Sequence, residues 1–177
     1  MISSPPPLEE SVREIDRRVR PIYAVWEVTL ACDLSCRHCG SRAGHARPDE
    51  LTTDECLDLV DQLADLGVHE VSLIGGEAYL RPDWCQIIER IAAREMVPLL
   101  TTGGRGVSEE RAARAKAAGL RSASVSLDGM ERAHDQLRHL TGSFAAARQA
   151  LRNLRGAGVQ ISVNTQLNRQ TMGDLPA

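Results

Sequence analysis

The chain has 177 residues, of which 42% are hydrophobic and 25% charged, and its formal net charge is −3. This composition is typical of one globular domain with a single hydrophobic core. The basic residues are scattered among acidic ones and no apolar run reaches about 18 residues, so we expect neither a nucleic-acid-binding surface nor a membrane span.

Segments that predict strands alternate with segments that predict helices along most of the chain. Residues 1–20 are expected to form an N-terminal arm with a short helix, and residues 21–177 to form the core domain. The expected strands are residues 23–31, 68–74, 98–102, 122–127 and 160–167. Strands that alternate with helices in this way indicate an α/β fold with a parallel sheet and right-handed crossovers.

Local signals mark the helices between these strands. Thr52 and Glu55 form a capping box before the first helix. Asp83 is expected to cap the second helix, and Ser108 the third. One helix is expected between the fourth and fifth strands, with apolar positions at Phe144, Ala147, Leu151 and Leu154.

Three cysteines follow the first expected strand. Cys32, Cys36 and Cys39 are spaced Cys-x3-Cys-x2-Cys in a short loop. Thiolates bind zinc, copper(I) and iron–sulfur clusters, and a cluster normally takes four sulfur ligands. Three cysteine ligands therefore leave one iron of a cubane cluster open for chemistry. Cys56 and Cys85 fall on helices away from this loop, and we expect them to pack in the core.

Zinc is the main alternative for the same three cysteines. His38 or His45 would complete a site of three cysteines and one histidine, which is a common set of structural zinc ligands. Zinc sites usually contain two short ligand pairs, and the sequence has no second pair. The spacing favours the cluster and leaves zinc open; a βα scaffold that binds no metal is the third alternative. The cytoplasm, where thiols stay reduced, is the expected location.

Polar or glycine-rich segments follow every expected strand. After the cysteine loop they are residues 75–77, 101–104 and 126–129, and Asn164 with Gln166. Because the carboxyl ends of parallel strands meet at one edge of a sheet, we expect these segments to contribute to one site.

Two of these segments resemble the radical S-adenosylmethionine (radical SAM) superfamily. Cys-x3-Cys-x2-Cys lies at the end of the first strand, and Gly75-Gly76-Glu77 lies at the end of the second. The resemblance implies a 4Fe-4S cluster bound by the three cysteines, with S-adenosylmethionine on the open iron. It also implies a partial parallel (β/α) barrel, of which this chain contains about five of six βα units. We therefore expect an N-terminal fragment of a longer protein.

The same resemblance assigns contacts with the cofactor. Glu77 would accept a hydrogen bond from the ammonium group of S-adenosylmethionine, and Arg138 would bind the carboxylate of S-adenosylmethionine through two parallel hydrogen bonds. His38 replaces a residue that is usually aromatic in the superfamily and lies near the adenine. Alternatively, Asp128 belongs to a tight turn and Arg138 to a surface salt bridge. The other expected contacts are at Gly75, Gly76, Ser126, Asp128 and Asn164.

Two further motifs narrow the resemblance. Ser126-Leu127-Asp128-Gly129 and His134-Asp135-x2-Arg138 are similar to the branch that modifies peptides and proteins and carries a SPASM-type cluster domain. This branch implies reductive cleavage of S-adenosylmethionine to a 5′-deoxyadenosyl radical, which abstracts hydrogen from the substrate. A peptide or protein is the expected substrate, with a small molecule as the alternative. A flavodoxin- or ferredoxin-like protein is the expected electron donor.

Overall fold

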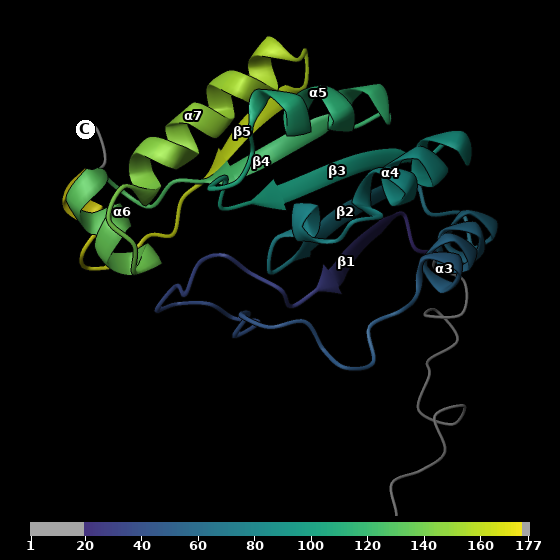
Figure 1. Ribbon diagram of the computed structural model, residues 1–177, viewed down its shortest axis with the longest axis horizontal. Coiled ribbons are helices and arrows are strands. Elements are labelled where there is room, and N and C mark those ends of the chain that lie inside the picture. Colours follow the sequence, from purple (N-terminus) through teal and green to yellow (C-terminus); the bar gives the residue numbers. More distant parts are fainter. Residues whose placement is uncertain (1–19, 175–177) are drawn as a thin grey trace, which may run out of the picture.

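The computed structural model describes residues 20–174, so the predicted N-terminal arm lies outside the described residues except for its last position. One sheet runs through the molecule with its strands in chain order (Figure 1). The strands are β1 (Tyr23–Thr29), β2 (Glu70–Gly75), β3 (Val97–Thr102), β4 (Ser122–Ser126) and β5 (Gln160–Asn164). Every neighbouring pair is parallel, which confirms the predicted partial (β/α) barrel.

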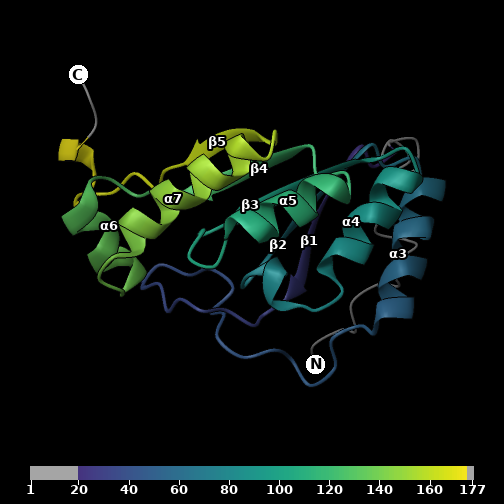
Figure 2. The same cartoon turned by 45° about the horizontal axis from the view of Figure 1, so that its top comes forward.

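Helices cover one face of this sheet. Figure 2 shows α3, α4, α5 and α7 side by side along that face, in the order in which they occur in the chain. The helices are α3 (Thr53–Asp65), α4 (Trp84–Ala93), α5 (Glu109–Ala117), α6 (Glu131–Arg138) and α7 (Ser143–Gly156), and two short 3-10 helices are η1 (Ala78–Leu80) and η2 (Met172–Asp174). Within residues 20–174, no helix is both long enough and apolar enough to cross a membrane.

The hydrophobic core lies between the helices and the sheet. Leu73 of β2 and Ile88 of α4 are fully buried there, and each such side chain contributes about 1.5–3 kcal/mol when it leaves water. Cys56 is also fully buried in this core and Cys85 packs against it, as predicted. The core therefore holds the sheet rigid and leaves the carboxyl ends of the strands for a site.

Two of the predicted helix caps are confirmed and one is wrong. Thr52 completes a capping box at the start of α3, and Ser108 accepts a hydrogen bond in the first turn of α5. Asp83 precedes α4 but makes no capping hydrogen bond with any described residue. Its carboxylate instead accepts hydrogen bonds from Arg81 and Thr53, which bring charge and a hydroxyl from outside the helix.

The chain between β4 and β5 contains two helices, where the sequence predicted one. α6 precedes α7, and the two are separated by His139 with φ of 57° and Gly142 with φ of 86°. Apolar periodicity does not reveal α6, because its eight residues are mostly charged or polar and bury only His134 and Leu137. This helix matters for the site because it carries Arg138 to the carboxyl end of the sheet.

Candidate cofactor site

The loop between β1 and α3 carries the three cysteines to the carboxyl end of the sheet. Gly44 N donates a hydrogen bond to Leu30 O over 2.8 Å, and Cys32 N donates one to Gly44 O over 3.1 Å. Glu50 strengthens the same turn, since its Oε1 accepts hydrogen bonds from Leu30 N at 2.8 Å and from Arg47 N at 2.9 Å. These contacts give the loop a defined shape through its own backbone.

The three cysteine thiols line one cavity of about 200 Å³. All three are free thiols of intermediate exposure. Burial raises the pKa of Cys32 to about 11 and also raises the pKa of Cys36, although the nearby Arg138 opposes the second shift. Both thiols are therefore protonated at neutral pH, and binding of a metal group would release their protons.

The spacing of the thiols suits a cluster better than a single zinc ion. Four zinc ligands lie within about 4 Å of one another, because each is 2.0–2.3 Å from the metal. Among the residues that the structure describes, candidate ligand atoms within 4.8 Å of one another belong to Cys32, Asp33 and Glu77, and the three cysteines form no such group. In a cubane cluster each cysteine binds a different iron, so more widely spaced sulfurs fit it.

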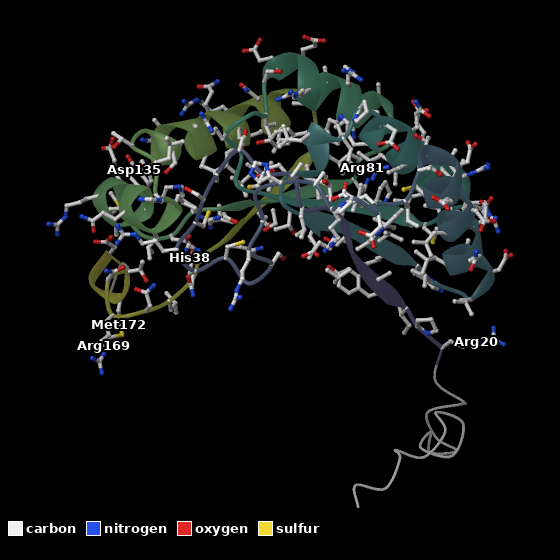
Figure 3. All side chains as sticks on the ribbon, turned by 60° about the horizontal axis from the view of Figure 1, so that its bottom comes forward. Arg20, His38, Arg81, Asp135, Arg169 and Met172 are labelled. Atoms are coloured by element: carbon white, nitrogen blue, oxygen red, sulfur yellow. The ribbon has the colours of Figure 1, made fainter. Side chains whose placement is uncertain are left out.

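The histidines do not complete a zinc site either. His38 Nε2 lies 3.2 Å from Asp128 Oδ2, and His45 is exposed. Figure 3 shows His38 toward the α6 end of the molecule and Arg81 toward the other end. The loop contacts α6 here, because Arg37 N donates a hydrogen bond to Leu137 O over 2.9 Å.

Gly75 and Gly76 allow the ends of β1 and β2 to approach closely. A Cβ on Gly75 would collide with the carbonyl oxygen of Thr29, and a Cβ on Gly76 would collide with that of Ala31. Gly75 also has φ of 135°, which a side chain disfavours. Both glycines line the thiol cavity, but the contact that excludes their side chains is with the protein backbone.

Glu77 is a buried carboxyl group beside the thiols, with 2% of its surface exposed. Gly103 N donates a hydrogen bond to its Oε1 over 2.6 Å, and the Thr102 hydroxyl donates one to its Oε2. Burial raises the pKa of Glu77 to about 7, despite these hydrogen bonds. Glu77 therefore changes its charge near neutral pH.

Arg138 and Asp128 form a buried ion pair. Arg138 is therefore not part of a surface salt bridge, and Asp128 does more than form a tight turn. Asp128 Oδ2 accepts a hydrogen bond from Nε of Arg138 over 2.9 Å and forms an ion pair with Nη2 at 2.7 Å. Its other oxygen accepts one from Gln166 N over 2.9 Å. The fork that was expected to bind the cofactor carboxylate is thus occupied by Asp128, and Nη1 of Arg138 is directed to Cys36 Sγ at 3.7 Å.

Every predicted site residue lines the thiol cavity or an adjoining cavity of about 490 Å³. Their shared walls join the two into one concave region. The residues common to both are Cys36, Cys39, Gly75, Ser126 and Arg138. The thiol cavity adds Cys32, Gly76 and Glu77, and the adjoining cavity adds His38, Asp128 and Asn164.

Residues 26–175 match the family described as the Radical SAM superfamily. The chain belongs to this superfamily. Mycofactocin maturase MftC of Mycobacterium tuberculosis is 33% identical to it over 177 residues, covering 98% of this chain and 44% of that protein. Fe-coproporphyrin III synthase of Methanosarcina barkeri is 30% identical over 171 residues, covering 96% and 43%. The chain therefore spans less than half the length of these curated relatives.

Solved structures show the same fold. SuiB of Streptococcus suis, bound to S-adenosylmethionine, matches with a TM-score of 0.76 at 17% identity, over 88% of this chain and 36% of that one. The anSMEcpe structure with bound AdoMet matches with a TM-score of 0.62 at 17% identity, over 81% and 43%. Radical SAM proteins use a 4Fe-4S cluster and S-adenosylmethionine, so family membership confirms the predicted cofactors and disfavours zinc.

Some contacts within this site were not predicted. Thr102 and Gly103 bind Glu77, His134 Nδ1 accepts a hydrogen bond from Asp128 N over 3.0 Å, and Gln166 N contacts the same aspartate. The glycine-rich sequence after β3 indicated a site at the end of that strand, but it did not indicate that Thr102 and Gly103 bind Glu77. The pairing with His134 has no local sequence signal, because α6 itself was not predicted.

Proposed function

We propose that this protein is a radical SAM enzyme whose cluster ligands are Cys32, Cys36 and Cys39. With its cofactors bound, the cluster would reduce S-adenosylmethionine and so generate the 5′-deoxyadenosyl radical that abstracts hydrogen from a substrate. The observation that carries the proposal is the shared cavity: the three thiols and residues 75–77 line it together at the carboxyl end of a parallel sheet. This is where folds of this kind bind cofactors.

The protein's own groups would bind and orient S-adenosylmethionine. Above its pKa of about 7, Glu77 presents a carboxylate that can accept a hydrogen bond from the cofactor ammonium group. Ser126 and Asn164 at the ends of β4 and β5 offer polar side chains to the adjoining cavity, and His38 offers an aromatic ring. We assign the ribose, carboxylate and adenine contacts of the cofactor to these side chains of the adjoining cavity. We also propose that residues 21–177 form the core domain.

A peptide is the substrate class that we propose first. Mycofactocin maturase MftC is named as a maturase, and SuiB has a solved structure with its precursor peptide SuiA. Ser126, Asp128 and Arg138, which belong to the two motifs that suggested the peptide-modifying branch, line the site, and we place the protein in that SPASM-type branch. Fe-coproporphyrin III synthase and the AdoMet-dependent heme synthase of Nitratidesulfovibrio vulgaris, 32% identical over 149 residues, support a porphyrin as the second candidate.

The reaction needs one electron from outside the protein. A flavodoxin- or ferredoxin-like donor supplies electrons singly and is the partner class that we propose. The free thiols of the site require a reducing compartment before iron binds, which suits the cytoplasm.

Anaerobic reconstitution with iron and sulfide tests the cluster assignment in the longest natural form of the protein. Visible absorbance and metal analysis should show the cluster of this site in the wild type and in Cys85→Ala, and one 4Fe-4S cluster fewer in Cys36→Ala. Cys85 is the matched control because it packs against the core, away from the cavities. Colourless protein that contains stoichiometric zinc would contradict the proposal.

Product analysis then separates the two substrate classes. After reduction, the reconstituted enzyme should release 5′-deoxyadenosine, and its natural substrate should increase that release. A short peptide encoded beside the enzyme should increase it if the peptide assignment is right, whereas a porphyrin precursor of heme should increase it if the second candidate is right. Release of no 5′-deoxyadenosine under any condition overturns the proposed activity.

A further inference from the structure

We propose that Arg138 is a positioning residue that raises the reduction potential of the cluster through its contact with Cys36. This inference rests on the proposed function, because it takes the three cysteines as cluster ligands. It concerns the free enzyme before S-adenosylmethionine binds, and so differs from a role in binding the cofactor carboxylate.

The three thiols have different hydrogen-bond donors. Cys32 Sγ accepts one from the backbone N–H of Leu34, and Cys39 Sγ accepts one from that of Ala43, each over 3.4 Å. Cys36 Sγ instead accepts a hydrogen bond from Nη1 of the charged Arg138 over 3.7 Å. One of the three ligands therefore has a cationic donor beside it, and the other two have neutral donors.

The guanidinium group cannot easily turn away from this sulfur. Nε and Nη2 are bound by Asp128, whose second oxygen is bound by Gln166 N. Asp128 is 1% exposed and the Arg138 side chain 12%, so the pair is shielded from water. With two of its nitrogens engaged, Arg138 presents Nη1 to the thiol loop as its remaining nitrogen. Among the described residues, the carboxyl groups of Glu77 and Asp33 also lie near the sulfurs, both beside Cys32.

Reduction adds negative charge to a cluster. A positive charge and a hydrogen bond at a ligand sulfur stabilise the reduced state, and burial strengthens both effects. Arg138 contacts the sulfur directly through Nη1, whereas Asp128 contacts Nε and Nη2 of the guanidinium. Removing the arginine should lower the potential, and removing the charge of Asp128 should raise it.

These opposite signs make the inference testable on the reconstituted protein without S-adenosylmethionine. The midpoint potential of the cluster, followed by EPR during a redox titration, should shift to more negative values in Arg138→Gln and to more positive values in Asp128→Asn. Arg138→Lys keeps the charge and should shift less than Arg138→Gln. Arg132→Gln removes an exposed arginine from the same helix and should leave the potential unchanged.

The outcomes separate this inference from the proposed function. A wild-type protein that binds no cluster overturns the proposed function itself. A cluster that forms but has the same potential in wild type and Arg138→Gln overturns this inference alone, as do equal shifts of the same sign in Arg138→Gln and Asp128→Asn. If Arg138→Gln binds no cluster, the potentials of Arg138→Lys and Arg132→Gln are compared instead. A more negative potential in Arg138→Lys supports the inference, and equal potentials in the two variants overturn it.

Discussion

Gly103 N donates a hydrogen bond to Oε1 of Glu77 over 2.6 Å and thereby joins the end of β3 to the end of β2 at the thiol cavity. The Thr102 hydroxyl binds the second carboxyl oxygen, so both oxygens of Glu77 have protein partners. Burial nevertheless raises the pKa of this carboxyl group to about 7. The protein thus keeps a carboxylate at the site at a cost in stability, which is typical of functional groups.

Glu77→Gln should stabilise the apoprotein at alkaline pH. Between the ordinary pKa of 4.5 and about 7 the folded state binds more protons than the unfolded state, so the free energy of unfolding falls as pH rises through this range. Across the whole range the wild type loses about 3 kcal/mol or less of its free energy of unfolding. Urea unfolding should find the variant and wild type similar at pH 5 and the variant more stable at pH 8.

A control and a second readout complete this experiment. Glu109→Gln changes an exposed carboxylate in the first turn of α5 and should retain the wild-type pH dependence. Glu77→Gln should at the same time weaken binding of S-adenosylmethionine to the reconstituted protein at pH 8. An unfolding curve whose pH dependence matches that of wild type would show that Glu77 is charged in the folded protein already at acidic pH.

Gly76→Ala should destabilise the fold strongly. An added Cβ collides with the carbonyl oxygen of Ala31, and this backbone group cannot move freely because it accepts a hydrogen bond from Glu77 N over 2.7 Å. We expect a loss of at least about 3 kcal/mol in urea unfolding, as for severe overpacking. Gly156→Ala at the end of α7 would contact nothing within 4 Å and should leave the free energy of unfolding unchanged or raise it by up to about 1 kcal/mol. Equal stability of the two variants would contradict the close approach of β1 and β2.

The parts of the fold that depend on local patterns were predictable from the sequence. Strand positions, the Thr52 capping box and the Ser108 cap each depend on residues a few positions apart. The grouping of three cysteines after β1 was also predictable, because it is contained within the segment from Cys32 to Cys39. The common rim of the strands then follows from the parallel sheet alone.

The parts that depend on distant residues were not predictable in the same way. Asp83 looks like a helix cap locally, but Thr53, thirty positions away, takes its carboxylate. Arg138 looks like a free fork for a carboxylate, and its contact with Cys36 spans 102 positions. The glycines at the end of β2 were expected to make room for a ligand, whereas the Ala31 backbone fills the space that a side chain on Gly76 would need.

Arg81→Met should destabilise the protein by leaving a buried carboxylate without its charged partner. Arg81 binds Asp83 through Nε at 2.9 Å and Nη2 at 2.7 Å, and Nη2 also donates to Leu51 O over 3.0 Å. The pair connects the end of the cysteine loop to the start of α4. Breaking such a pair costs about 3–5 kcal/mol. Urea unfolding of Arg81→Met, Asp83→Leu and the double variant should show that the double variant loses less than the sum of the two single variants, and additive losses would contradict the pairing.

His134 should make the folded protein sensitive to acid. Burial, helped by the charge of Arg138, lowers its pKa below the usual 6.5, so the unfolded state binds more protons as pH falls below that value and the free energy of unfolding decreases. His134→Leu should remove this acid dependence but cost about 1–3 kcal/mol at pH 8, because Asp128 N loses its acceptor. Glu77 changes the free energy of unfolding in the opposite direction over an overlapping pH range. His134→Leu should therefore be made in, and compared with, the Glu77→Gln variant. His69→Gln, at an exposed position, is the matched control. If His134→Leu retains the acid dependence of its Glu77→Gln parent, the buried neutral imidazole is not its source.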